Sequence, residues 1–322
     1  VLSVAESLTN IVLAPLQDGI EGISLSANWM WPCRSQQGED ARLYNAVDAL
    51  SRFCQEIKVN VPTGKDSLSM TQNYPDGSKV ISPGTVIVSS GSEVSDIRKV
   101  VAPVIRPVDS IVYHIDFSFD QLRLGGSAFA QIQGKVGDDV PTVTNPEYFH
   151  DAFQAVQQLV NEGLVVAGHD VNAGGLITTL LEMCFANTRG GLQIDLTGMN
   201  GQDTETLLFA ENPALVIQVD KANEKAVDTL LEACGIGFIK IGKPVDKRII
   251  SIKTPQHRKL EFDIDHLRDI WYTTSCELDR LQSMNGMADE RFHNYSRQPV
   301  VHKFNKNFTG RFTQYGISPD RT

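Results

Sequence analysis

The sequence has no long apolar run, and no segment near its start combines the charged, apolar and small-residue regions of a secretory signal. A membrane-spanning helix needs roughly 20 predominantly apolar residues. No stretch of the chain approaches that length. We therefore expect a cytoplasmic protein with no membrane partner.

Cysteine is scarce and scattered. The five cysteines show no C-x-x-C spacing, and their number is odd. Such cysteines are typical of reduced thiols in the core of a cytoplasmic protein. They argue against a disulfide framework.

Positive charge is also in deficit. Lys and Arg total 29 against 39 Asp and Glu, so the net charge is −10 and the pI is near 5.2. Nucleic-acid binding needs clustered Lys and Arg, and this balance therefore argues against nucleic acid as a partner. An acidic protein can still hold a single phosphate with backbone N–H groups and Mg²⁺.

The rest of the composition is ordinary for a globular protein. Hydrophobic residues make up 41% and charged residues 21% of 322 residues, a length that allows two domains with a core each. The chain starts at Val1 without Met and is helical in pattern almost at once. We expect it to be part of a longer polypeptide.

Residues 166–176 form the run around which the sequence is organised. They predict a buried strand, a polar turn and the glycine start of a helix. The polar and glycine residues of this run are His169, Asp170, Asn172, Gly174 and Gly175. A helix start with free backbone N–H groups, beside a carboxylate that can hold Mg²⁺, suits a nucleotide phosphate. Alternatively, His169 and Asp170 cap the helix and pair with each other.

A helix predicted over residues 2–16 carries a second polar pair. Its apolar residues recur at helical spacing, and Glu6 and Asn10 are one turn apart, so their side chains emerge together. This pair is either a set of oxygen ligands for Mg²⁺ or part of a solvated helix face.

Residues 63–70 contain a third polar run, which includes Gly64, Lys65, Asp66 and Ser67. An extended chain would point Lys65 and Ser67 to one side. The G-x-x-x-x-G-K spacing is missing and no helical pattern follows, which excludes a Walker motif. The run is either an anion-binding turn or an ordinary turn with a solvated lysine.

The remaining pattern alternates between helix and strand, with a domain boundary at residues 103–107, where two prolines occur. Strands are predicted at residues 23–31, 85–90, 110–115, 192–196, 214–219, 237–241, 249–252 and 261–263. Helices are predicted at residues 41–57, 94–101, 148–162, 176–187, 223–234 and 264–281, with a further helix starting within 122–128. From residue 282 the chain is polar and irregular, and residues 305–322 have the pattern of a linker.

Several motifs in register give a family resemblance. They are residues 5–11 (AESLTNI), 25–30 (LSANWM), 38–41 (GEDA), 62–70 (PTGKDSLSM), 169–176 and 181–186 (LEMCFA). In this order and at these spacings they resemble the second half of the synthetase region of large, single-chain phosphoribosylformylglycinamidine synthases. The resemblance covers residues 1–290.

The resemblance implies a two-domain fold like that of aminoimidazole ribonucleotide synthetase, with α/β and α+β parts. Residues 1–104 would form an N-terminal α+β domain, truncated at its start, whose sheet pairs with a partner sheet. Residues 105–263 would form a larger α/β domain. Residues 264–322 would be a terminal helix and a linker toward a glutaminase domain.

The resemblance also implies two related sites in the full enzyme: one is catalytic, and the second holds Mg²⁺ with ATP or ADP that looks structural. The positions that match the metal ligands of the second site are Glu6, Asn10 and Asp170. The positions that match nucleotide or substrate contacts are Asn28, Gly64, Asn172, Gly174 and Gly175. The positions that match the catalytic segment are Lys65, Asp66 and Ser67.

The sequence departs from the family at one part of this site. The family usually has Ser and then Asp after His-Asp-x, whereas this chain has Asn172 and Ala173. One carboxylate is therefore missing, and we expect a weaker hold on the nucleotide. A further family aspartate would lie upstream of Val1, and no cysteine here has the neighbours of a glutaminase nucleophile.

The implied chemistry is ATP-dependent amidation of formylglycinamide ribonucleotide, with ammonia from glutamine. The expected partners are the first half of the full-length chain, a glutaminase domain and a small ribonucleotide substrate. We expect the isolated segment to be inactive and to self-associate through its exposed sheet. The alternatives are a non-catalytic nucleotide-binding scaffold half, or a free-standing relative such as a selenophosphate or hydrogenase-maturation synthetase.

Overall fold

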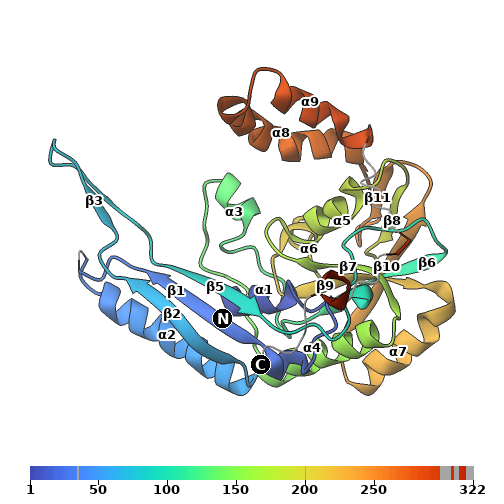
Figure 1. Cartoon of the computed structure of the whole chain (residues 1–322), viewed down its shortest axis with the longest axis horizontal. Helices are drawn as coiled ribbons and strands as arrows, with labels where there is room; N and C mark the ends of the chain where they lie inside the picture. Colours follow the sequence, from blue (N-terminus) through green and yellow to red (C-terminus); the bar gives the residue numbers. More distant parts are fainter. Residues whose placement is uncertain (35, 200, 298–305, 308–311, 317–322) are drawn as a thin grey trace. The chain divides into compact units, whose positions relative to one another are not determined.

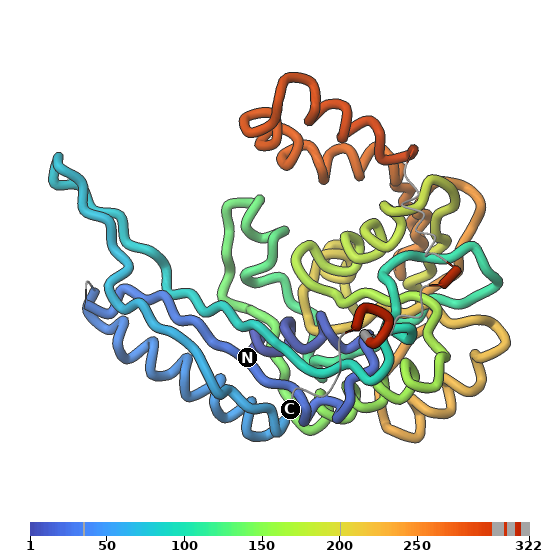
Figure 2. Tube along the Cα trace, viewed as in Figure 1, coloured from blue at the N-terminus to red at the C-terminus, as the bar shows by residue number. Residues whose placement is uncertain are grey.

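The computed structural model describes residues 1–34, 36–199, 201–297, 306–307 and 312–316. The chain separates into two compact units, residues 1–268 and residues 269–322, and each is described by itself (Figure 1, Figure 2). Among the described residues, no helix is long and apolar enough to cross a membrane.

A three-stranded sheet opens the first unit. Its order is β2-β1-β5, with β1 (Ser24–Met30) parallel to β2 (Asn60–Ser67) and antiparallel to β5 (Thr85–Gly91). The parallel pair needs a crossover, which α2 (Glu39–Glu56) provides. α1 (Leu2–Thr9) packs against β5.

One face of this sheet packs inward and the other is open. Leu25 of β1 shares a buried core with Leu50 and Phe53 of α2. Asn28 is in register with Lys65 on β2 and Ile87 on β5. Strand alternation places these three residues on the face opposite Leu25, which we call the open face. Ile87 is 51% exposed there.

A hairpin extends from the same sheet (Figure 1). β3 (Thr71–Asn73) and β4 (Lys79–Ile81) pair antiparallel, and the turn between them closes with a hydrogen bond from the Gly77 N–H to the Tyr74 carbonyl. No residue from Thr71 to Val80 is buried. The hairpin is therefore held by its own pairing and not by a core.

Seven strands form the larger sheet, in the order β12-β11-β8-β10-β6-β9-β7. They are β6 (Ser110–Asp116), β7 (Val165–Val171), β8 (Gly191–Asp195), β9 (Ala214–Asp220), β10 (Phe238–Val245), β11 (Ile249–Lys253) and β12 (Lys259–Asp263). Only β8 and β11 pair in parallel, and the other neighbours are antiparallel. The alternation of elements along the chain therefore does not produce a parallel sheet.

Helices cover both faces of this sheet. They are α4 (Pro146–Asn161), α5 (Gly175–Phe185), α6 (Thr204–Phe209) and α7 (Glu224–Ala233), while the short α3 (Ala128–Ile132) has no buried residue. Tyr113 of β6 shares a core with buried residues of α4 and α7, while its neighbour Val112 shares a second core with α5 and α6. Because successive side chains of a strand point to opposite faces, α4 and α7 cover one face and α5 and α6 the other.

The first of these cores extends across the expected domain boundary. It contains Leu8, Leu25 and Phe53 from the first hundred residues, together with Phe149 and Leu215 from the larger sheet and its helices. Phe53 and Phe149 meet edge to face, with ring centroids 5.6 Å apart. The division into residues 1–104, 105–263 and 264–322 stays a prediction.

Some predicted elements differ from the structure. The helix expected over residues 2–16 ends at Thr9, and the helix expected over 94–101 is a single 3₁₀ turn, Ile97–Lys99. α6 was not predicted. α9 (Met287–Asn294) forms where irregular chain was expected, after α8 (Ile264–Gln282). The linker predicted at 305–322 lies mostly outside the described residues.

Candidate functional site

α1 and the end of β7 meet at one carboxylate. The side-chain amide of Asn10, which caps the C-terminus of α1, donates to Oδ2 of Asp170 over 3.3 Å. Asn172 donates to the same oxygen, also over 3.3 Å. Asp170 is 6% exposed. Two segments that are 160 residues apart in sequence therefore converge on one buried acidic group.

Glu6 belongs to the same electrostatic group. Its side chain lies on the exposed side of α1, one turn before Asn10. Local desolvation, followed by the negative charges of Asp170 and Glu211, raises the pKa of the Glu6 carboxyl. The Glu6 carboxyl thus lies within the electrostatic range of two other carboxylates.

His169 is held between two carboxylates. Its Nδ1 lies 3.2 Å from Oδ1 of Asp170, and its Nε2 lies 3.3 Å from Oε2 of Glu182 on α5. Burial opposes the imidazolium, but the hydrogen bonds to Asp170 and Glu182 outweigh it and raise the pKa of His169 to about 10. The predicted pairing of His169 with Asp170 is present. The predicted capping is not, because the N-cap of α5 is Gly174 and no side chain caps it.

The two glycines at the start of α5 adopt conformations that favour glycine, with φ of +88° at Gly174 and +69° at Gly175. A Cβ on Gly175 would lie 2.7 Å from the Leu208 carbonyl oxygen. Their N–H groups are not free: Gly174 donates to Oε1 of Glu211 over 2.8 Å, and Gly175 donates to the Asn172 carbonyl over 2.9 Å. These two N–H groups are therefore not available to an anion. That the start of α5 binds a phosphate stays a prediction.

Glu211 is the site residue that the sequence did not reveal. It follows α6 in the turn before β9, and its Oε1 also accepts the N–H of Ala128 at the start of α3 over 2.8 Å. In the sequence it is one carboxylate in a turn, with no periodicity or spacing to mark it. Only the tertiary fold places it beside Gly174.

The oxygen donors of this cluster fit a hard cation. Mg²⁺ is usually held by one or two carboxylates, with water and phosphate oxygens completing its shell. Glu6, Asp170 and the side-chain oxygen of Asn10 match that description. Among the described residues, no three His, Cys, Asp or Glu side chains gather as a metal site. The role of these residues as Mg²⁺ ligands stays a prediction.

A cavity of about 480 Å³ lies beside the cluster. Glu6 and Asn10 line it from α1, and residues 86–90 of β5 line it from the three-stranded sheet. Its volume is within the range of small-molecule sites, about 300–1,000 Å³. The polar side of α1 therefore faces a space large enough for a ligand.

The Gly64-Lys65-Asp66-Ser67 run lies within β2 and not in a turn. Gly64 is opposite Ala27 on β1, and a Cβ there would overlap the Ala27 carbonyl oxygen, so the close approach of the strands requires glycine. Lys65 shares the open face with Asn28, whereas alternation turns Asp66 to the other side. Among the described residues, no hydrogen bond or ion pair joins this run to Asp170.

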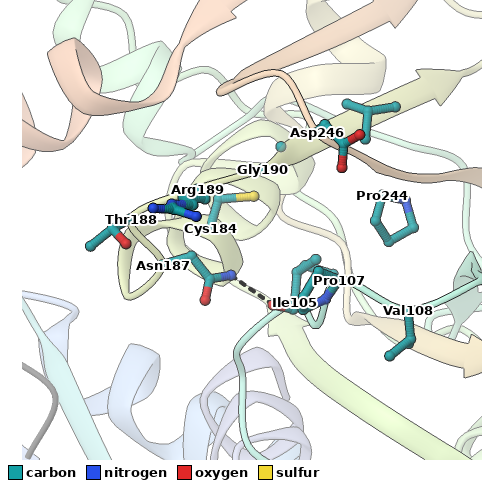
Figure 3. A pocket seen from close by; sticks show the side chains of 12 residues that line it. Ile105, Pro107, Val108, Cys184, Asn187, Thr188, Arg189, Gly190, Pro244 and Asp246 are labelled. Atoms are coloured by element: carbon teal, nitrogen blue, oxygen red, sulfur yellow. Dashed lines mark hydrogen bonds between the residues drawn. The ribbon is translucent and has the colours of Figure 1, made fainter.

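A second cavity, of about 660 Å³, lies at the C-terminal end of α5 (Figure 3). Asn187 donates to the Ile105 carbonyl over 2.6 Å at its rim. Cys184 also lines it, and burial raises the pKa of the Cys184 thiol to about 12, so this cysteine is not a thiolate nucleophile. No predicted site residue lines this cavity.

Comparison with known families divides the chain into two matching regions. The FGAR-AT PurM_N-like domain matches residues 1–93, and the C-terminal domain of AIR synthase related proteins matches residues 109–254. These two matches support a PurL/AIR synthase-like fragment. The probable phosphoribosylformylglycinamidine synthase (chloroplastic/mitochondrial) of Arabidopsis thaliana is 37% identical over 285 residues. That match covers 88% of this chain and 20% of the relative, so the chain spans about a fifth of the relative's length.

Solved structures share the PurL/AIR synthase-like fold. T. maritima PurL complexed with ATP matches with a TM-score of 0.62 at 10% identity, over 83% of this chain and 40% of that chain. The E. coli hydrogenase maturation protein HypE matches with a TM-score of 0.52 at 15% identity, over 81% of this chain and 79% of that chain. These likenesses confirm the predicted fold class.

Proposed function

We propose that this chain is the second synthetase half of a phosphoribosylformylglycinamidine synthase. The full enzyme would convert formylglycinamide ribonucleotide, ATP and glutamine to the amidine, ADP, phosphate and glutamate. The similarity to the Arabidopsis thaliana synthase supports this assignment. The observation that carries it is the convergence of Asn10 and Asn172 on Asp170, beside a ligand-sized cavity.

In this proposal, Glu6, Asn10 and Asp170 hold Mg²⁺, and Asn172 contacts the nucleotide. The ion would neutralise the polyphosphate charge that three neighbouring carboxylates otherwise repel. His169, held by Glu182, positions Asp170 through their ion pair. Gly174 and Gly175 shape the turn and contact the nucleotide by van der Waals packing of their backbone, since their N–H groups already donate to Glu211 and to the Asn172 carbonyl.

The open face of the three-stranded sheet would face the catalytic site, which the first half of the enzyme completes. Asn28, Gly64, Lys65 and Ser67 lie on β1 and β2 of this sheet. Asp66 would contribute from the opposite face. Phosphoryl transfer depends mainly on positioning and charge neutralisation, which suits an exposed lysine. We expect the isolated chain to be inactive, because the first half and the glutaminase domain that supplies ammonia are separate from it.

A scaffold role is the second candidate. The cluster at Asp170 would then bind a structural nucleotide and support the partner half. A free-standing synthetase is less favoured, because the relative that is 37% identical to the chain is a phosphoribosylformylglycinamidine synthase. In a full-length enzyme with a scaffold role for this site, Asp170→Ala would lower the melting temperature while kcat changes little. With a catalytic role, the same substitution would lower both the melting temperature and kcat.

Calorimetric titration of this chain with ADP tests the proposed site. We expect binding that requires Mg²⁺ and that Asp170→Ala weakens at least about tenfold, because the mutation removes a metal ligand. Asp18→Ala is the matched control, since Asp18 is exposed and has no hydrogen-bonding role in its helix cap. Equal affinities of the two variants for Mg²⁺ and ADP would reject the site.

A further inference from the structure

Glu211 joins two elements that are far apart in sequence. Its Oε1 accepts the backbone N–H of Gly174, at the start of α5, and of Ala128, at the start of α3. Both distances are 2.8 Å. One carboxylate oxygen therefore fixes the start of α5 and the start of α3 relative to each other.

The neighbours of Glu211 strengthen the same connection. Asn212 is 2% exposed; its Oδ1 accepts the Arg123 N–H over 3.2 Å, and its amide donates to the Gln121 carbonyl over 3.0 Å. Phe209 stacks on Phe129, with centroids 4.6 Å apart. The end of α6 and the turn after it therefore contact residues 121–129, which we call the α3 segment, at three points besides Glu211.

Glu211 also lies beside the turn that follows Asp170 and Asn172, since it accepts the N–H of Gly174. Both of its hydrogen bonds use Oε1, and within the described part of the chain Oε2 has no hydrogen-bond partner. Glu211 therefore lies beside the proposed nucleotide site, and both of its hydrogen bonds come from backbone N–H groups.

We propose that Glu211 is a positioning residue for the nucleotide site, holding the start of α5 and the α3 segment at fixed positions beside Asp170. This inference rests on the proposed function. Glu211 acts here as a hydrogen-bond acceptor and does not ligate the metal. Fixing the backbone before the ligand arrives lowers the ordering cost of binding. Its charge is not required, so an uncharged acceptor of the same length can replace it.

The test compares three substitutions by calorimetry with ADP and Mg²⁺. Glu211→Ala leaves two N–H groups without their acceptor, and we expect the Kd to rise at least about tenfold. Glu211→Asp is too short to reach both N–H groups and should also weaken binding. Glu211→Gln keeps a carbonyl oxygen at the same reach, and its Kd should stay within about twofold of the unsubstituted chain. Glu232→Ala and Glu232→Gln, at an exposed glutamate of α7, control for the change in net charge.

Amide hydrogen exchange gives a second readout. Exchange at Gly174 and Ala128 should accelerate in Glu211→Asp and Glu211→Ala and stay slow in Glu211→Gln. A loss of affinity in Glu211→Gln equal to that in Glu211→Asp would overturn the inference and assign a metal-binding role to the charge. Unchanged affinity in Glu211→Asp would also overturn it. Failure of the unsubstituted chain to bind ADP would instead reject the proposed function.

Discussion

At the scale of single residues, Gly175 shows how tightly the turn after β7 is built. Its φ is +69°, and the backbone of Leu208 and Phe209 leaves no room for a Cβ. We expect Gly175→Ala to lower the free energy of unfolding by at least about 3 kcal/mol, from backbone strain and steric overlap together. Urea denaturation of the two proteins measures this difference.

Gly235 supplies the control for that prediction. Its φ is +70°, but a Cβ there would meet no atom within 4 Å. Gly235→Ala therefore carries only the strain of the left-handed conformation, about 1 kcal/mol. If Gly175→Ala and Gly235→Ala lower the free energy of unfolding by similar amounts, the steric overlap with Leu208 and Phe209 does not contribute to the loss.

At the scale of elements, Gln157 explains why the first helix is shorter than predicted. This side chain of α4 is 3% exposed and donates to the carbonyls of Val12 and Ala14 over 2.6 and 2.8 Å. Its Oε1 accepts the Leu16 N–H over 2.9 Å. The residues after α1 thus bond to another helix instead of continuing their own. The spacing of apolar residues in segment 2–16 could not reveal that Gln157 forms hydrogen bonds with the backbone there.

Replacing Gln157 with leucine should be strongly destabilising. Gln157→Leu keeps the volume similar but leaves three backbone groups without partners, at a cost of about 3 kcal/mol or more in the free energy of unfolding. The adjacent Gln158 is exposed, and Gln158→Leu should change stability by less than about 0.5 kcal/mol. Chemical denaturation with matched m-values measures both. A small loss at Gln157 would mean that water replaces the side chain.

At the scale of the whole molecule, the open face of the three-stranded sheet is the surface from which we expect self-association. Ile87 is 51% exposed on this face, in register with Asn28. Exposed apolar side chains on a sheet face favour association. Ile87→Lys should therefore lower the weight-average mass in sedimentation equilibrium toward that of one chain.

Val80→Lys is the control, because Val80 is 58% exposed but lies on the hairpin away from that face. It should leave the association unchanged. If Val80→Lys dissociates the assembly and Ile87→Lys does not, the hairpin is the associating surface. A monomeric unsubstituted chain would contradict the expectation outright.

The sequence by itself determined the family, the fold class and most of the strands. Amphipathic spacing and strand alternation are local properties, and the matching motifs lie in separate segments, so each could be identified without contacts. The family resemblance also selected Glu6, Asn10 and Asp170 as one group. The structure joins Asn10 and Asp170 by a hydrogen bond, and the role of the three residues as metal ligands stays a prediction.

Only the tertiary structure decided the order of the larger sheet, the end of α1, the place of Lys65 within a strand and the occupation of the Gly174 N–H by Glu211. Each of these depends on contacts between segments far apart in the chain. Local propensity carries no information about such contacts. A buried backbone N–H or C=O group must form a hydrogen bond, and the tertiary fold determines which group lies close enough to be its partner.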